Sequence, residues 1–227
     1  MFTIIIVGCG ATGSILISLL AQYAISEKKI KSIILIDGDR VEEKNFRNQR
    51  FTKKDINQNK ARVLSKRYSK LEIEISYIDE YITGNEKLID LIKNIEGNAI
   101  LVGCVDNNIA RKHMHDVFYS DINSLIYIDT GNGDGNNRVG QTICGAKQNG
   151  KVIKPPVGDI YPQAILEDSA KIDKNEYRCS QIEDHPQNFV INVMSATVTF
   201  TMINNLISLK KINKEFIKFN SDKISVN

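Results

Sequence analysis

Residues 4–13 of this chain read IIIVGCGATG and decide its fold. The segment begins as a run of β-branched apolar residues, typical of a buried strand, and continues into the pattern G-x-G-x-x-G at Gly8, Gly10 and Gly13. Residues 11–24 are apolar on nearly every side, as expected for a helix buried against a sheet. A glycine turn between such a strand and helix predicts a nucleotide site, because it lets a phosphate approach the backbone at the helix N-terminus.

A second informative segment, residues 33–50, reads IILIDGDRVEEKNFRNQR. Its apolar beginning predicts a strand that ends on Asp37. An acidic residue at the end of this strand can take the ribose hydroxyls of a nucleotide. The glycine turn and Asp37 together fit two classes of protein, an NAD-binding domain and an ATP-using adenylating domain. The residues that follow Asp37 are needed to separate these classes.

Strand-like and helix-like segments alternate through the first two thirds of the chain, and this rhythm predicts an α/β fold with a Rossmann-like, doubly wound, mostly parallel sheet. The predicted strands cover residues 3–7, 32–37, 72–78, 99–105 and 125–128. The predicted helices cover residues 11–24, 55–70, 86–95 and 108–119.

The pattern changes after residue 130. Residues 131–135 read as a turn-rich loop, and residues 138–146 and 151–153 as paired antiparallel strands. Residues 188–209 read as a long apolar helix, and residues 212–220 as a last strand. We therefore expect one domain over residues 1–227. Residues 1–130 would be its nucleotide-binding part, and residues 131–227 would be an extension of antiparallel strands, a crossover region and a C-terminal helix.

The composition is that of an ordinary globular protein. The chain has 227 residues, of which 42% are hydrophobic and 25% charged. The net charge of +3 is too small to indicate a nucleic-acid partner. The chain starts directly with a strand and no apolar run approaches the length of a membrane span, so we expect a cytoplasmic protein without a membrane contact. Its four cysteines form no CxxC pair, which excludes a four-cysteine zinc site.

The sequence has more polar and charged residues after Asp37, at positions suited to a nucleotide site, than a dehydrogenase needs. A polyphosphate that binds with magnesium requires hard oxygen ligands and cations. Two of the residues are cations that could reach phosphates, and others could supply neutral hydrogen bonds. The candidate set is Asp39, Asn45, Gln49, Arg50, Lys60, Asp106 and Asn107.

With these residues the sequence resembles the ThiF family, the bacterial relatives of ubiquitin-activating enzymes. The family pattern appears here as GCGATG, DGDRVEEKNFRNQ, NKA and VDNN. Residues 128–145, IDTGNGDGNNRVGQTICG, look like the family's G-N…G-Q strand pair. Residues 179–198, CSQIEDHPQNFVINVMSATV, look like the crossover and following helix of short members, including those of PRTRC-type plasmid and phage clusters. The resemblance covers roughly residues 3–209.

The resemblance implies binding of ATP and Mg²⁺ and adenylation of the C-terminal carboxylate of a small ubiquitin-like or sulfur-carrier protein, by a homodimer. Asp37 would hold the ribose. Asp39 and Asn45 would line the nucleotide pocket, and Lys60 would neutralise the triphosphate. Asp106 would orient magnesium over the α-phosphate, which the substrate carboxylate attacks with loss of pyrophosphate.

Two features depart from the family pattern, one residue and one helix. Asn48 stands where the family usually has arginine, although Arg47 and Arg50 flank it. Many members also carry an N-terminal helix with an arginine that reaches the phosphates of the partner subunit, and we expect this chain to lack it. Such an arginine can raise the rate of phosphoryl transfer by several orders of magnitude. Without it the protein could catalyse the reaction slowly or could only bind the nucleotide, and the sequence leaves both readings open.

Other readings remain open at this stage. Cys179 is the candidate thiol nucleophile, because it lies in a polar stretch beside Arg178, but it also fits an incidental loop cysteine. Asp106 could also cap the helix that begins near Asn108, and this role is compatible with a magnesium role. The alternatives for the whole protein are an NAD-dependent oxidoreductase, a non-catalytic nucleotide-binding partner in a gene cluster, or adenylation of a small-molecule or RNA-borne carboxylate.

Overall fold

The computed structural model describes residues 1–133, 138–166 and 188–226. Its strands pair in the order β3-β2-β1-β4-β5-β6-β8-β9, and β7 pairs with β6. The first five strands along this order run parallel, and the remaining pairings are antiparallel. The strands are β1 (Phe2–Val7), β2 (Ile30–Ile36), β3 (Glu74–Ile78), β4 (Asn98–Gly103), β5 (Leu125–Asn132), β6 (Val139–Gln148), β7 (Lys151–Lys154), β8 (Phe216–Asn220) and β9 (Ser225–Val226).

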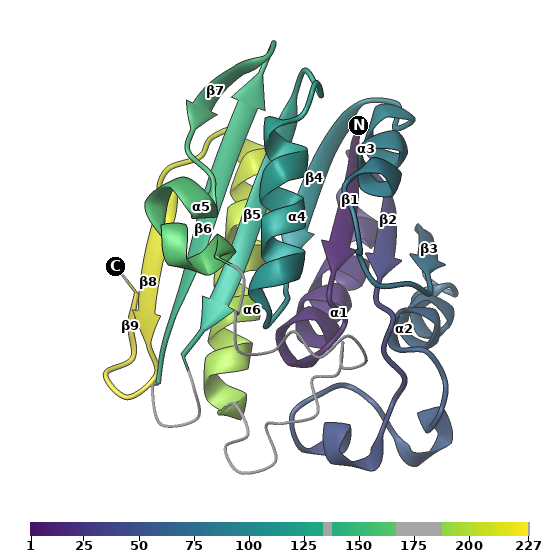
Figure 1. Ribbon diagram of the computed structural model, residues 1–227. Coiled ribbons are helices and arrows are strands. Elements are labelled where there is room, and N and C mark those ends of the chain that lie inside the picture. The colour runs from purple at the N-terminus through teal and green to yellow at the C-terminus, as the bar shows by residue number, and fades with distance from the viewer. Residues whose placement is uncertain (134–137, 167–187, 227) are drawn as a thin grey trace.

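Helices cover both faces of this sheet (Figure 1). In that view α3, α4 and α5 lie in front of the sheet, and α1 and α6 lie behind it. The parallel strands all end at the lower edge of the sheet in the same view. The helices are α1 (Ala11–Ser26), α2 (Lys60–Tyr68), α3 (Glu86–Lys93), α4 (Asn108–Tyr119), α5 (Val157–Ile160) and α6 (Phe189–Asn204).

Alternation along β1 divides the core into two layers. Ile4 and Ile6 join the cluster that includes α1 and α6, whereas Ile5 and Val7 join the cluster that includes α3 and α4. Successive side chains of a strand point to opposite faces, so an uninterrupted apolar run needs cover on both sides. The predicted doubly wound, mostly parallel sheet with an antiparallel C-terminal part is therefore confirmed.

The predicted helix over residues 55–70 is wrong in its first part. Lys53–Asp55 forms a separate 3₁₀ turn, and the helix begins only at Lys60. Asn57 has a left-handed backbone with φ of 64°, which breaks the helical path. The side chain of Asn59 accepts a hydrogen bond from the Arg62 amide at 2.8 Å and thereby fixes the start of α2.

Several boundaries in the C-terminal third also differ from expectation. β5 continues to Asn132, into the first two residues of the predicted loop, because its pairing with β6 extends to the Asn132–Gly140 pair. The last α-helix ends at Asn204 and passes into a π-helical turn, Asn205–Leu209. β8 is shorter than predicted, and β9 was not predicted, since two residues leave no pattern to read.

The helical stretch Phe189–Leu209 corrects the expectation that no apolar run reaches the length of a membrane span. It has 21 residues and a mean hydropathy of 1.4, and it is the one such stretch in the described part of the chain. In the structure 56% of its most apolar window is buried, and α6 packs against α1, β5 and β6. Its apolar character is accounted for by packing against the sheet.

Candidate active site

The glycine turn between β1 and α1 is shaped by close backbone contacts. Gly8 has φ of +93°, and a Cβ there would lie 2.5 Å from the carbonyl oxygen of Cys104. A Cβ at Gly13 would lie 2.0 Å from the carbonyl oxygen of Gly8. Gly10 differs from both, because a Cβ there would meet only the Gln49 side chain, at 4.0 Å. The space over Gly10 is thus open to a ligand.

The N-terminus of α1 lacks the side-chain cap that α2, α4 and α6 have. Asn59, Asn107 and Asn188 accept hydrogen bonds from the first turns of α2, α4 and α6. The residue at this position of α1 is Gly10, which has no side chain to accept such a bond, and the first turn of α1 carries no acidic residue. The free amides and the helix dipole therefore favour an anion at this point.

Asp37 follows β2 and is held against the glycine turn. One of its carboxylate oxygens accepts the Cys9 amide at 2.6 Å, and the other accepts the Asp39 amide at 2.7 Å. Burial raises the pKa of Asp37 to about 6, and the Lys60 ammonium opposes that rise. The carboxylate is thus fixed beside the turn, as a ribose ligand requires.

The raised pKa of Asp37 predicts acid-sensitive nucleoside binding. Only the charged carboxylate is a full acceptor for two ribose hydroxyls, and about one tenth of it remains charged one pH unit below its pKa of about 6. We expect adenosine affinity to fall about tenfold between pH 7 and pH 5. Calorimetry with adenosine avoids the titration of phosphate groups. Asp37→Asn should bind weakly at both pH values, and a flat profile for the unsubstituted protein would contradict the assigned role.

Asp39 and Lys60 form a buried ion pair at the same edge. Lys60 Nζ lies 2.9 Å from Asp39 Oδ2, and the Lys60 side chain is 7% exposed. Tyr81 donates a hydrogen bond from its hydroxyl to Asp39 Oδ1. Its ring lies over Gly38, where a Cβ would be 2.6 Å from the ring carbons. The structure therefore gives Lys60 a carboxylate partner, and adds Tyr81 to the site.

The loop after β2 presents three further candidates in different ways. The Gln49 side chain reaches over Gly10, and its buried Oε1 accepts no hydrogen bond within the described part of the chain. A polar ligand would satisfy that atom. Asn45 is buried, and its side-chain oxygen accepts the Glu42 amide at 2.8 Å, so it first of all fixes the turn Glu43–Arg47. The side chain of Arg50 is exposed.

Asp106 lies after β4 and does not cap α4. Asn107 is the cap, since its side-chain oxygen accepts the Ala110 amide at 2.8 Å. Asp106 is exposed and faces a cavity, so its carboxylate is accessible. Among the described residues no group of three His, Cys, Asp or Glu could hold a metal ion. A single carboxylate, that of Asp106, fits a Mg²⁺ ion that enters together with a polyphosphate, because the phosphate oxygens would supply further ligands.

The cavity beside Asp106 has a volume of about 740 Å³. It lies between α4, β5, β6 and β8, and its wall includes Asp106, Arg111, Asp129, Gln141, Tyr161 and Lys218. Asn132, also in the wall, donates through Nδ2 to Thr12 Oγ1 at 3.3 Å and to Asn192 Oδ1 at 2.7 Å. These bonds join the cavity wall to the first turn of α1 and to α6.

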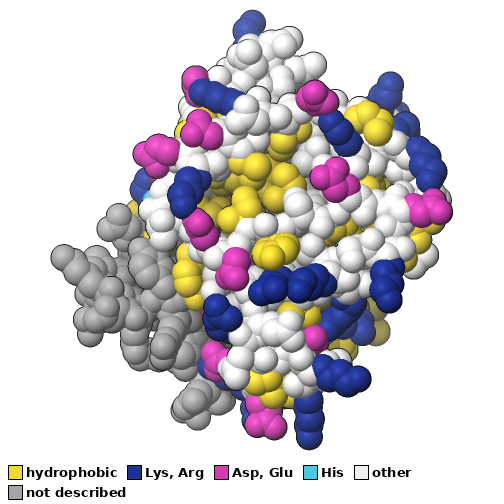
Figure 2. Space-filling model, turned by 90° about the vertical axis from the view of Figure 1, so that its right-hand side faces the viewer, with side chains coloured by type: hydrophobic (Ala, Val, Ile, Leu, Met, Phe, Trp, Pro, Cys, Tyr) yellow, Lys and Arg dark blue, Asp and Glu magenta, His cyan; other side chains and the backbone are white. Residues whose placement is uncertain are grey.

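A smaller hollow, lined mainly by apolar side chains and called the apolar hollow below, lies between the ends of β2 and β3 and helix α3. Its volume is about 220 Å³, and its wall includes Ile36, the residue before Asp37. Figure 2 shows hydrophobic side chains gathered between charged ones on this face of the molecule. The apolar side chains of the wall are Ile36, Ile78, Tyr81, Ile82, Leu88 and Leu91.

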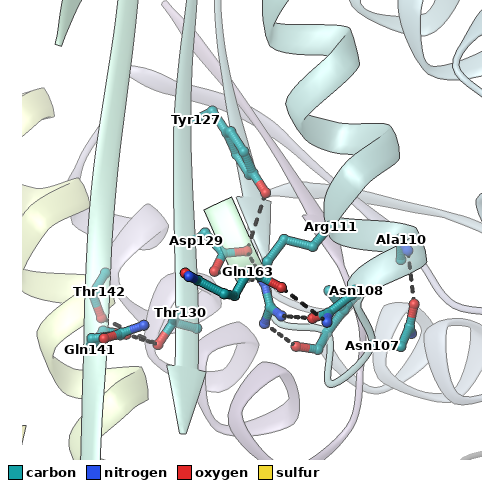
Figure 3. A network of polar contacts seen from close by, with 11 residues as sticks. Asn107, Asn108, Ala110, Arg111, Tyr127, Asp129, Thr130, Gln141, Thr142 and Gln163 are labelled. Carbon is teal, nitrogen blue, oxygen red and sulfur yellow. Dashed lines mark hydrogen bonds and ion pairs between the residues drawn. The ribbon is translucent and has the colours of Figure 1, made fainter. Parts of the chain in front are cut away.

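One buried polar group at this edge was not predicted from the sequence. Arg111 on α4 donates through Nε to both carboxylate oxygens of Asp129, at 3.0 Å each (Figure 3). Burial raises the pKa of Asp129, but Arg111 opposes this, and the contact to a permanently charged guanidinium keeps the pair ionised. The available signal was the aspartate that ends the buried strand IYID, together with an arginine on the neighbouring helix.

The site thus combines an uncapped glycine turn, a fixed carboxylate after β2 and an accessible carboxylate after β4. A model of the ThiF family matches residues 1–221. The chain belongs to the ThiF family.

Solved structures resemble this ThiF-family chain throughout its length. The crystal structure of E. coli MccB with ATP has a TM-score of 0.66 and 20% identity, and the match covers 99% of this chain and 62% of that one. MccB in complex with N-formylated MccA gives a TM-score of 0.68 and 21% identity, over 99% of this chain and 63% of that one. The crystal structure of selenomethionine PaaA gives a TM-score of 0.69 and 14% identity, and the match covers 100% of this chain and 63% of that one.

At these identities the likeness shows a shared fold. This ThiF-family chain spans about 62–63% of the length of those solved chains. Among curated protein sequences, none matches it.

The fold of this ThiF-family chain brings most of the predicted residues to one edge of the sheet. Gly8, Gly10, Gly13, Asp37, Asp39, Gln49, Lys60 and Asp106 all lie in or directly after the carboxyl ends of β1, β2 and β4, or contact residues there. Cys179, the predicted thiol nucleophile, lies outside the described residues. Cys9 and Cys104 are unsuited to nucleophilic chemistry, because burial raises the pKa of both thiols.

Proposed function

We propose that this protein uses ATP to adenylate the C-terminal carboxylate of a small ubiquitin-like protein, a sulfur-carrier protein or a peptide. The observation that carries the proposal is the position of Asp106. It follows β4, which pairs with β1 and so ends beside the glycine turn that suits phosphates, and it lines a cavity of about 740 Å³, which is large enough for the end of a polypeptide. A reaction between a nucleotide and a carboxylate needs such a junction of two binding sites.

The nucleotide would be placed by groups already fixed in the free protein. Amides at the start of α1 would bind phosphate oxygens, and Asp37 would accept the ribose hydroxyls. The base would enter the apolar hollow that begins at Ile36. Lys60 would add positive charge beside the phosphates. That MccB was solved with ATP supports this choice of nucleotide.

The acceptor would enter from the cavity side. Its carboxylate oxygen attacks the α-phosphorus of ATP, the bond to the β-phosphate oxygen breaks, and pyrophosphate leaves with the electron pair. Mg²⁺, held by Asp106 and the phosphates, would supply neutralisation of phosphate charge. MccB was also solved with MccA, which supports a peptide or small protein as acceptor here. As a second step of the proposal, the Cys179 thiolate would attack the carbonyl carbon of the acyl-adenylate, forming a thioester and releasing AMP. A homodimer is the expected assembly.

Two measurements test the proposal. The first is thermal unfolding with Mg·ATP against NAD. A ligand at about 100 times its Kd should add about 2.7 kcal/mol of stability, which in a chain of this size raises Tm by about 5–10 °C. Only ATP should do so, and stabilisation by NAD alone would favour an oxidoreductase.

The second measurement is ATP–pyrophosphate exchange with candidate acceptors. A free C-terminal carboxylate should support exchange, and the same peptide with a C-terminal amide should not, because the amide offers no nucleophilic oxygen anion. ATP binding without exchange for any acceptor would indicate a non-catalytic nucleotide-binding protein instead.

A further inference from the structure

The guanidinium of Arg111 makes contacts beyond its ion pair with Asp129. Arg111 is 8% exposed, and its Nε faces the Asp129 carboxylate at 3.0 Å. Tyr127 donates a hydrogen bond to the same carboxylate, to Oδ2 at 3.2 Å. Gly103 allows this carboxylate to approach β4, because a Cβ there would lie 2.9 Å from Asp129 Oδ2. The Nε side of the guanidinium is thus fully anchored in the protein (Figure 3).

Its two terminal nitrogens reach both ends of the turn that carries Asp106. Nη2 donates to the carbonyl oxygen of Val105 at 2.8 Å, and Nη1 donates to Asn108 Oδ1 at 3.3 Å. Val105 and Asn108 flank the Asp106–Asn107 dipeptide directly. One rigid, planar group therefore spans the base of the turn from which the exposed Asp106 carboxylate projects.

Only arginine can make this set of bonds. Its five N–H donors point in fixed directions within one plane, so one side chain can serve a carboxylate, a backbone carbonyl and a carboxamide together. A lysine at the same place keeps the charge but has a single nitrogen, and it cannot reach three acceptors on three sides. The turn would lose at least one of its two supports.

We propose that Arg111 is a positioning residue for Asp106. It holds the 105–108 turn so that the Asp106 carboxylate stays at the junction of the nucleotide and acceptor sites. This inference rests on the proposed function for its effect on catalysis. Its structural part, a turn held by the guanidinium, concerns the free protein and can be measured without any ligand.

The test compares Arg111→Lys with Arg62→Lys, a matched change at an exposed position of α2. Hydrogen–deuterium exchange of the ligand-free proteins is followed by mass spectrometry. Arg111→Lys should speed exchange in the peptide spanning 104–109 by about tenfold, the effect of losing one hydrogen bond of about 1.4 kcal/mol, and should leave β1 and α1 unchanged. Uniformly faster exchange throughout the protein would overturn the inference, because it indicates a role in global stability only.

The same variants are assayed for ATP–pyrophosphate exchange. Arg111→Lys should lower kcat by about tenfold while KM for ATP changes by less than about threefold, since the groups that bind the nucleoside lie elsewhere. In an Asp106→Ala background it should cause no further loss of Mg²⁺-dependent affinity for a non-hydrolysable ATP analogue, measured by calorimetry. Additive losses would overturn the inference.

Asp129→Asn provides a second variant if Arg111→Lys does not fold. It keeps the shape of the anchor and removes its charge. Hydrogen exchange in residues 104–109 should therefore be about threefold faster, and kcat about threefold lower, than in the unsubstituted protein. Absence of pyrophosphate exchange in the unsubstituted protein would count against the proposed function, whereas normal exchange in both variants would count against the role of Arg111 alone.

Discussion

Asp106→Ala is expected to lower ATP–pyrophosphate exchange by about 1,000-fold, equivalent to about 4 kcal/mol of transition-state stabilisation. Asp106 is an exposed residue that lines the cavity proposed for the acceptor and follows β4, which pairs with the strand before the glycine turn proposed for the nucleotide. Its removal would delete the carboxylate that we propose as the protein's ligand for Mg²⁺, at the point where phosphate charge would redistribute. Because the side chain is exposed, the free energy of unfolding should change by less than about 0.5 kcal/mol.

Binding and chemistry separate in this variant. Adenosine affinity should stay within about threefold of the unsubstituted protein, because Asp37 and the apolar hollow are untouched. Asp90→Ala, at an exposed position of α3, is the matched control and should leave exchange unchanged. Retained exchange in Asp106→Ala would count heavily against adenylation at this site.

Lys60→Met should have the second largest effect, on both stability and activity. Lys60 is buried against Asp39, with 7% and 22% of the two side chains exposed. Removing the lysine leaves the partly exposed Asp39 carboxylate with the Tyr81 hydroxyl as a donor but without a cation, and we expect this to cost about 2 kcal/mol of unfolding free energy. Exchange should fall about 100-fold, because the cation that we propose beside the phosphates is lost.

Lys60→Met also predicts a shift that a merely unstable variant would not show. The Lys60 ammonium lowers the pKa of Asp37 from the value that burial alone would give. Without it the Asp37 pKa rises above about 6, so the fall in adenosine affinity should move to higher pH. Lys66→Met, at an exposed position of the same helix, is the control. An unchanged pH profile in Lys60→Met would contradict the coupling.

Most of the fold could be predicted from local patterns. Apolar runs such as IIIV in β1 leave little choice but a strand covered on both faces, and α4 begins and ends where its pattern indicated, at Asn108 and Tyr119. Prediction failed where single residues interrupted a pattern. The left-handed Asn57 separated a 3₁₀ turn from α2, and pairing with β6 extended β5 through a glycine that read as a loop.

The candidate site was predicted as a list of residues and not as a set of contacts. Gly10, Asp37 and Asp106 lie where strand-end positions in a parallel sheet put them. The sequence pattern did not show that Lys60 faces Asp39, that Asn45 first of all fixes a turn, or that Asn107 rather than Asp106 caps α4. Each of these depends on which neighbour a polar group meets after folding.

The sequence by itself determined the strand–turn–helix order, the glycine turn and the acidic residue that follows β2. These features depend on short-range sterics and on the period of apolar residues, both of which are written along the chain. Only the tertiary structure decided the pairing of Lys60 with Asp39, the seat of Tyr81 over Gly38 and the link from Arg111 to Asp129. Those partners lie 21, 43 and 18 positions apart, and no local rule specifies contacts at that separation because they arise from packing of the whole sheet.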